Sequence, residues 1–176
     1  MSNDDLFITT SEQLQTLLNK CSQCYSITNK GKNIFVIQEL LTFNVFSQKT
    51  RKLVIIVNTL DQFVTRDIGH WITIIIDTKL QTAIVIDSLN NYKQTNNETL
   101  KSISLFCKRN NLKMKQLYFR AQQINSQKCG YHTIYWTHFA HNNSLKAILK
   151  KKKTLSRYSL KNIEKYIVNH VLKRIK

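Results

Sequence analysis

The most regular feature of this sequence is a set of short apolar runs separated by polar loops. The run Lys52–Leu60, with Leu-Val-Ile-Ile-Val inside it, is apolar on both faces and predicts a central strand. Weaker strand patterns cover Asn33–Leu41 and Lys113–Arg120. Two further apolar runs, His70–Ile76 and Ala83–Ile86, are joined by a short polar turn, which predicts a β-hairpin.

Helical spacing of apolar residues occurs between and after these strands. It covers residues 10–20, a segment from Asn96 or Asn97 to about Asn110, and Gly130–Ala140, and it returns at 144–153 and 159–175. No repeat or linker divides the chain, and 176 residues suffice for one hydrophobic core, so we expect a single domain over 1–176. The pattern predicts an α+β fold, a mixed central sheet flanked by helices.

The hairpin brings two polar residues together at its open end. A two-residue turn at Thr78-Lys79 and a four-residue loop over Asp77–Leu80 give the same register, which places His70 opposite Asp87. Directly opposed residues of antiparallel strands share a face, with Cβ atoms about 5 Å apart. We therefore expect the imidazole and the carboxylate to be neighbours if the turn is regular, since a slip of one residue would separate their faces.

Charge is distributed unevenly along the chain. Residues 1–100 carry nine basic and nine acidic side chains, whereas residues 101–176 carry eighteen Lys and Arg and one acid, Glu164. An AT-rich genome would raise the number of lysines, but it would not remove the acids. The asymmetry predicts a polyanionic partner such as DNA, with the candidate contacts Lys150, Lys151, Lys152, Lys153, Lys173 and Arg174.

The chain has no signature of secretion or membrane insertion. Its N-terminus is acidic, and its apolar runs are too short to cross a bilayer. Four cysteines without framework spacing are typical of a reducing compartment. We expect an intracellular protein, or one packaged from an intracellular site, that is monomeric and has no membrane contact.

One cysteine has the surroundings of a nucleophile. Cys129 precedes Gly130 at the start of a predicted helix, where the helix dipole favours an anion. His70, which follows Gly69 at a loop-to-strand junction, is a candidate base for the thiol proton. Asp87 would then bind the other ring nitrogen and hold the histidine. Two of the three glycines flank these residues, which favours a site over unrelated turns.

Alternatives to each of these roles remain open. A lone cysteine on an apolar helix is most often part of the core. His132 could act as the base, although a side chain one helical turn beyond Cys129 tends to run alongside the thiol. Asp77 could replace Asp87, although it lies at the far end of its strand.

Two other pairs of residues have the spacing of metal ligands. They are Cys21 with Cys24, and His138 with His141. Neither pair has an evident third or fourth ligand in the sequence, so we expect no metal site.

Acyl transfer also requires hydrogen-bond donors for the developing oxyanion. The backbone N–H of Cys129 is one candidate, and an upstream side-chain amide is a second. Gln122, Gln123 and Gln127 are available, although Gln127 adjoins the turn before the helix.

Together these residues resemble a known family. Gly69-His70-Trp71, an acid seventeen residues after the histidine, and Gln…Cys-Gly are similar to the adenain-type cysteine proteases of adenoviruses, virophages and Polinton-like elements. They are more distantly similar to the SUMO-deconjugating proteases. The segment Lys52–Thr59 also resembles the one that precedes the adenain histidine, and the likeness spans about residues 50–140. The resemblance implies a papain-like, adenain-like fold.

The resemblance also implies roles for the candidate residues. These are His70 as base, Asp87 as third triad member, Cys129 as nucleophile, and Trp71 as a shield over the site. The adenovirus enzymes have glutamate at the third position, where this chain has aspartate.

The same resemblance implies a glutamine in the oxyanion hole. Adenain spacing points to Gln122, whereas the SUMO-protease pattern Gln-x-Asn-x-x-x-Cys-Gly points to Gln123. Because Asn125 occupies the asparagine position, Gln123 is favoured.

Adenain-type enzymes cut capsid and core precursors during virion maturation, after small residues such as Gly-Gly. The resemblance therefore implies these substrates, and a location in the virion or at the site of assembly in the cytoplasm or nucleus. It implies viral double-stranded DNA as a candidate activator and no small-molecule cofactor. Adenain also uses a disulfide-linked peptide, but Cys107 lies on a predicted helix, so such a peptide is not inferred.

Three other functions compete with this one. A deconjugase for a ubiquitin-like modifier would use the same chemistry on a different substrate. An acetyltransferase related to bacterial effectors would reuse the same residues with acetyl-CoA, and no residue requires it. A non-enzymatic DNA-binding protein would account for the charge, but it would leave the two glycine-flanked residues without a role.

Overall fold

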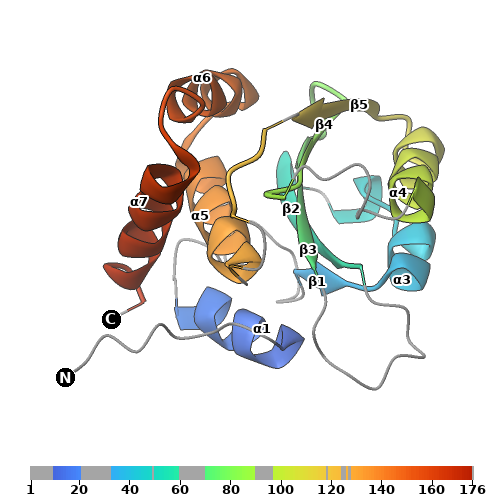
Figure 1. Cartoon of the computed structure of the whole chain (residues 1–176). Helices are drawn as coiled ribbons and strands as arrows, with labels where there is room; N and C mark the ends of the chain where they lie inside the picture. Colours follow the sequence, from blue (N-terminus) through green and yellow to red (C-terminus); the bar gives the residue numbers. More distant parts are fainter. Residues whose placement is uncertain are drawn as a thin grey trace.

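The structure is a computed structural model with a mixed β-sheet at its centre and helices on both sides (Figure 1). This arrangement confirms the predicted α+β class. The structure describes residues 10–20, 33–48, 50–59, 70–89, 97–117, 119–123, 126 and 128–175. Among the described residues, no helix is long and apolar enough to span a membrane.

The sheet contains five strands in the order of the chain. β1 (Ile34–Phe35) pairs in parallel with β2 (Lys52–Asn58), and β2, β3 (Trp71–Asp77) and β4 (Thr82–Ile86) form an antiparallel meander. β5 (Lys113–Leu117) pairs in parallel with β4. All of β3 and β4, and all of β2 after Lys52, are buried. These strands are apolar on both faces because helices cover both faces.

Each face of the sheet belongs to its own hydrophobic cluster. On one face, Val54, Ile56 and Trp71 pack with residues of four helices. These are α1 (Ser11–Lys20), α5 (Cys129–Asn142), α6 (Leu145–Leu155) and α7 (Leu160–Leu172). On the other face, the intervening strand residues pack with α4 (Asn97–Arg109) and α3 (Ile37–Thr42), near the 3-10 turn η1 (Phe46–Gln48) (Figure 1).

In addition to its apolar packing on the sheet, the central helix α5 is bound at its C-terminal end by a lysine of β2. The Lys52 ammonium donates to the carbonyl oxygens of Ala140 at 2.7 Å and Asn143 at 2.8 Å. A cation satisfies the free carbonyl groups at a helix C-terminus. Lys52 begins β2 opposite Asp77, so the last turn of α5 lies at the hairpin-turn end of the sheet. The N-terminus of α5 consequently points toward the other end, where β3 begins and β4 ends.

The predicted register of the β3–β4 hairpin is wrong by two positions. Asp77 pairs with Thr82, and four residues form the turn. The Asp77 carboxylate accepts the N–H of Leu80 at 3.0 Å, and Gln81 has φ of 45°. This side-chain bond and the left-handed residue close a four-residue turn over 78–81, one position later than the four-residue loop expected.

The shift still keeps the two polar residues on one face. Carried one step past the Thr73–Ile86 pair, the observed register places Asp87 opposite Ile72. His70 is then a diagonal neighbour of Asp87, not its direct partner. An even shift preserves the face, and diagonal neighbours remain within reach of longer side chains.

The predicted strand Asn33–Leu41 is also largely wrong, because only Ile34 and Phe35 are extended. The chain then turns into α3, whose Glu39 carboxylate accepts the N–H of Val36 at 3.3 Å. This bond caps the first turn, and Leu40 on that helix is fully buried. Local capping and helical spacing therefore prevail over β-propensity.

The remaining predicted elements occur with small changes at their ends. β5 ends at Leu117, α6 runs two residues further than expected, and α7 ends at Leu172. α1 is capped by Thr10, which exchanges hydrogen bonds with Gln13. The predictions for Cys21, Cys24, Leu60, Gly69, Asn96, Asn125 and Gln127 lie outside the described residues.

Candidate active site

The structure joins His70 and Asp87 by a short hydrogen bond. His70 precedes β3 and Asp87 follows β4, so both residues lie at the same end of the sheet. The distance from His70 Nε2 to Asp87 Oδ1 is 2.6 Å. Asp87 is 3 % exposed, and its Oδ1 also accepts the N–H of Leu89 at 3.0 Å. One carboxylate oxygen therefore bonds both the imidazole and the Leu89 backbone, which fixes the orientation of the carboxylate.

The backbone of His70 is fixed to the end of β2. Thr59 donates its N–H to the His70 carbonyl at 2.9 Å, and the Thr59 hydroxyl accepts the His70 N–H at 3.3 Å. These two bonds continue the β2–β3 pairing by one residue beyond Trp71. The imidazole therefore projects from a rigid strand end, which limits its conformational freedom.

Cys129 is the first residue of α5 and lies beside this histidine. Its side chain is a free thiol, 6 % exposed. The first N–H groups of α5 have no partner within the helix, and the helix dipole favours negative charge there. The first turn of α5 therefore places the sulfur beside free backbone N–H groups.

The electrostatics of His70 reflect both of its neighbours. Burial lowers the pKa of His70, but hydrogen bonds with Asp87 and Cys129, together with their charges, outweigh burial and raise the pKa to about 9. Among the described residues, Nδ1 makes no hydrogen bond of ordinary length. Nδ1 is thus the ring nitrogen open to the thiol, and catalytic hydrogen bonds are often long before substrate binds.

The two rival residues from the sequence lie in different surroundings. His132 is 1 % exposed, and neither ring nitrogen has a hydrogen-bond partner among the described residues. Burial and the charge of His70 lower the pKa of His132 to about 3, so it stays neutral. Asp77 lies at the far end of β3, where it pairs with Arg51 at 3.5 Å. Neither residue takes part in the His70–Asp87 pair.

The two candidate glutamines have different partners. Gln122 is 3 % exposed, and its Oε1 accepts the Ser88 hydroxyl at 2.7 Å. The Ser88 carbonyl accepts the N–H groups of Ala121 and Gln122 at 2.9 and 3.0 Å. Because Ser88 directly follows Asp87, the strand end that holds the histidine also holds the segment leading to Cys129.

Gln123 faces α7 and has an exposed side chain. Its backbone N–H donates to Glu164 at 3.0 Å, and its Nε2 lies 3.5 Å from the same carboxylate oxygen. The second contact is at the outer limit of a hydrogen bond. Glu164 itself is 7 % exposed. The structure thus fixes the Gln123 backbone and leaves its amide only weakly held.

Trp71 and the lysines complete the set of predicted residues. Trp71 is 1 % exposed and packs in the same cluster as Cys129. Of the candidate DNA contacts, Lys150, Lys151, Lys152 and Lys153 lie on α6, and Lys173 and Arg174 follow the end of α7. His138 bonds His170 and Arg174. No group of three or more metal-ligating side chains occurs in the part of the chain that the structure describes.

Comparison with known families decides the identity of this arrangement. The model of the Ulp1 protease family, C-terminal catalytic domain, matches residues 42–171, which include all of the residues described above around Cys129. This chain belongs to the Ulp1 protease family. Members of this family are cysteine proteases, so this chain is a thiol-dependent protease.

Solved structures with a similar fold include members of the Ulp1 family. ChlaDub1 from Chlamydia trachomatis has a TM-score of 0.50 at 15% identity, over 97% of this chain and 79% of that one. The yeast Ulp1 domain in complex with Smt3, the yeast ortholog of SUMO, has a TM-score of 0.46 at 16% identity, over 92% and 77%. At these identities the likeness concerns the fold alone. The comparison with curated proteins found no match.

The Ulp1-family match confirms the predicted recognition and the papain-like fold. Two residues around the site were not predicted, Ser88 and Glu164. Glu164 had a signal in the sequence, because it is the one acid after residue 100. Ser88 had only its position next to Asp87, and its bond to Gln122 spans thirty-four residues.

Proposed function

We propose that this Ulp1-family protease is an endopeptidase that cleaves capsid and core precursor proteins during virion maturation, assisted by viral double-stranded DNA. The His70–Asp87 pair beside Cys129 supports the chemistry. The excess of basic side chains on α6 and α7 supports a polyanionic partner. The enzyme would act in the virion, or in the cytoplasm or nucleus where virions assemble.

The first half of the proposed reaction forms an acyl-enzyme. The Cys129 sulfur attacks the carbonyl carbon of the scissile bond, and its proton resides on His70 Nδ1, the ring nitrogen that has no partner among the described residues. The tetrahedral intermediate collapses when Nδ1–H protonates the departing amine. Asp87 holds the ring through Nε2 and stabilises its positive charge throughout.

The second half releases the acid product. His70, now neutral, accepts a proton from a water molecule that attacks the thioester carbon. The sulfur leaves as thiolate and again pairs with the imidazolium. Apart from the substrate and the attacking water, all groups in this cycle belong to the protein, so the proposed chemistry requires no small-molecule cofactor.

The backbone N–H of Cys129 and the Gln123 amide are the proposed oxyanion donors. Gln123 suits this role because its side chain is exposed and its contact with Glu164 is long. Gln122 is less suited, because its amide is buried and bonded to Ser88. In this proposal Gln122 fixes the loop, and Trp71 packs beneath the site and shields it.

Alanine variants should separate the two glutamines. We expect Gln123→Ala to lower kcat by about 10²–10³-fold with little change in thermal stability, which is the usual effect of losing one oxyanion donor. We expect Gln122→Ala to lower the free energy of unfolding by about 1–3 kcal/mol, because it leaves the buried Ser88 hydroxyl without its acceptor. Peptide kinetics of both variants measure the change in kcat, and thermal melting measures the change in stability.

The anchor of Gln123 offers a matched control. Glu164→Gln keeps an oxygen that can accept the Gln123 N–H, whereas Glu164→Ala does not. If the loop is held in this way, the alanine variant loses kcat and the glutamine variant keeps most of it. A Gln122→Ala variant that loses kcat at unchanged stability would reverse the assignment of the two amides.

A deconjugase for a ubiquitin-like modifier is the second candidate, and the Ulp1-family match favours it. The two functions differ in substrate and share their chemistry. Under the first function, the purified protein cleaves peptides after Gly-X-Gly or Gly-Gly, and duplex DNA increases the rate. Under the second, SUMO or ubiquitin carrying a C-terminal electrophile labels Cys129 rapidly, and DNA has no effect.

Mass spectrometry of the labelled cysteine and peptide kinetics with and without DNA separate these outcomes. Efficient labelling by a modifier probe together with absent endopeptidase activity would overturn the maturation role. It would leave the cysteine protease chemistry in place.

A further inference from the structure

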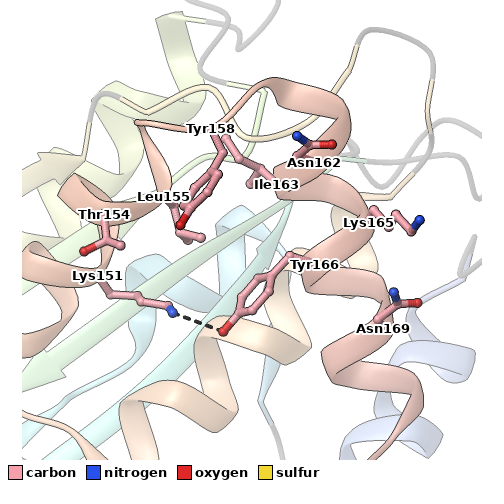
Figure 2. A pocket seen from close by; sticks show the side chains of 9 residues that line it. All are labelled: Lys151, Thr154, Leu155, Tyr158, Asn162, Ile163, Lys165, Tyr166 and Asn169. Atoms are coloured by element: carbon pink, nitrogen blue, oxygen red, sulfur yellow. Dashed lines mark hydrogen bonds between the residues drawn. The ribbon is translucent and has the colours of Figure 1, made fainter.

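A groove of about 490 Å³ lies between α6 and α7, apart from the residues around Cys129. Leu155 and Ile163 contribute apolar surface to it, and two tyrosines with exposed side chains line it. Tyr158, in the turn after α6, is 57 % exposed, and Tyr166, on α7, is 42 % exposed. Figure 2 shows both rings in the space between the two helices. Exposed aromatic rings in a concave surface are typical of binding sites.

The groove also carries cations at fixed positions. The Lys151 ammonium lies 4.8 Å from the centre of the Tyr166 ring and donates to its hydroxyl at 3.0 Å (Figure 2). Lys165 lines the groove on the α7 side, and Asn162 and Asn169 add side-chain amides. A lysine bonded to a tyrosine in this way has already lost part of its conformational entropy, so less entropy is lost when a ligand binds.

The surface around the groove is cationic throughout. Between residues 145 and 175 the only acid is Glu164, which is buried and bonded to the Gln123 backbone. Ten basic side chains occupy the same stretch: Lys146, Lys150, Lys151, Lys152, Lys153, Arg157, Lys161, Lys165, Lys173 and Arg174. The exposed surface of α6 and α7 therefore complements a polyanion.

We propose that the α6–α7 groove binds single-stranded nucleic acid, with bases stacked on Tyr158 and Tyr166 and phosphates paired with lysines such as Lys165. Stacking needs bases with open faces, and in a duplex those faces are covered by neighbouring base pairs. The amides of Asn162 and Asn169 can donate to and accept from base edges. An acidic peptide would use the lysines and leave the tyrosine rings without a ligand.

This site extends the nucleic-acid contact of the proposed function and does not depend on catalysis at Cys129. Duplex DNA can still pair with the outer lysines of α6, but it would not use the two rings. Peptide hydrolysis without nucleic acid is therefore measured in parallel with binding. If the groove does not bind nucleic acid, only the binding measurement fails. If the protein is not a protease, only the hydrolysis measurement fails.

Fluorescence anisotropy of the full chain with a labelled oligodeoxythymidylate of about twelve nucleotides tests the proposal. We expect Tyr158→Ala and Tyr166→Ala each to weaken binding by about tenfold, and Tyr158→Phe to bind like the unmodified protein. Lys165→Gln should reduce the slope of log K against log salt by about one. Lys108→Gln, on the opposite face in α4, and Leu105→Ala, an exposed apolar residue there, serve as controls. Hydrolysis of a short peptide should be unchanged in both tyrosine variants.

Matched ligands identify what the groove recognises. An abasic oligonucleotide of the same length should bind at least tenfold more weakly than the oligodeoxythymidylate, and oligouridylate shows whether the 2′-hydroxyl matters. Equal binding of the abasic strand, or tyrosine-to-alanine variants that bind normally, would overturn the proposal. Tighter binding of a duplex or of oligoglutamate that depends on Tyr158 would overturn it in favour of that ligand.

Discussion

Replacing Cys129 by alanine is expected to abolish peptide-bond hydrolysis while the protein remains folded. The variant removes the only atom proposed to form the covalent intermediate, and loss of the nucleophile in comparable triads costs about 10⁶-fold in kcat. The side chain is small, so we expect a melting temperature within a few degrees of the unmodified protein. Peptide kinetics and circular dichroism measure the two quantities.

Cys107 provides the matched control for this experiment. It is the other free cysteine that the structure describes, and it lies buried in α4 on the opposite face of the sheet. Burial raises the pKa of the Cys107 thiol to about 11, so it stays protonated and unreactive. Cys107→Ala should keep kcat, and a peptide electrophile should modify Cys129 alone of the two. Activity in Cys129→Ala comparable to the unmodified protein would remove the proposed mechanism.

The second large effect is expected at the His70–Asp87 pair. His70→Ala should lower kcat/KM by about 10⁴–10⁶-fold, because no other described base is placed to accept the thiol proton. Asp87→Asn keeps the shape of the side chain and loses its charge, so we expect a loss of about 10³–10⁴-fold. Steady-state kinetics with a fluorogenic peptide measure both.

The pH dependence of Asp87→Asn gives a sharper test. The pKa of His70 is raised to about 9, which keeps the imidazolium protonated at neutral pH and available to the leaving amine. Activity should therefore fall as pH rises through about 9. Asp87→Asn removes the carboxylate charge that raises the pKa of His70. The alkaline limb of kcat/KM should therefore move to lower pH. Asp77→Asn, at the far end of β3, should leave both rate and pH profile unchanged.

The same shift has a consequence for stability. A histidine whose folded pKa lies above its ordinary value binds its proton more tightly in the native state. The contribution of the His70 proton to the free energy of unfolding is fully present below pH 6.5 and is lost as pH rises through about 9. Asp87→Asn should reduce this loss in unfolding free energy between those pH values. Identical stability profiles for Asp87→Asn and Asp77→Asn would contradict the assignment of Asp87.

Much of the fold is encoded in local patterns along the chain. The run Leu-Val-Ile-Ile-Val identifies β2 as a central strand because apolar side chains on both faces require cover from both sides. The spacing of the apolar residues likewise identifies α4 and α5. The period of two along a strand also predicts that His70 and Asp87 share a face. This prediction still holds because the observed register differs from the predicted one by an even number of residues.

Other features depended on single contacts that no local pattern specifies. The hairpin turn lies later along the chain than predicted because the Asp77 carboxylate caps it, and the strand after Asn33 is short because Glu39 caps a helix. These bonds span three residues each, but each competes with an equally regular alternative. Sequence period alone does not decide between such alternatives.

The sequence by itself determined the family resemblance, the uneven charge and the three residues proposed for catalysis, because each depends on residue type and short spacing. Only the tertiary structure decided that the Gln122 side chain is buried and bonded to the Ser88 hydroxyl, whereas the Gln123 backbone N–H is bonded to the Glu164 carboxylate. It also decided that two exposed tyrosines from different segments line one groove. These features come from segments that pack against each other only after the sheet and helices assemble, and long-range packing leaves no periodic signal in the chain.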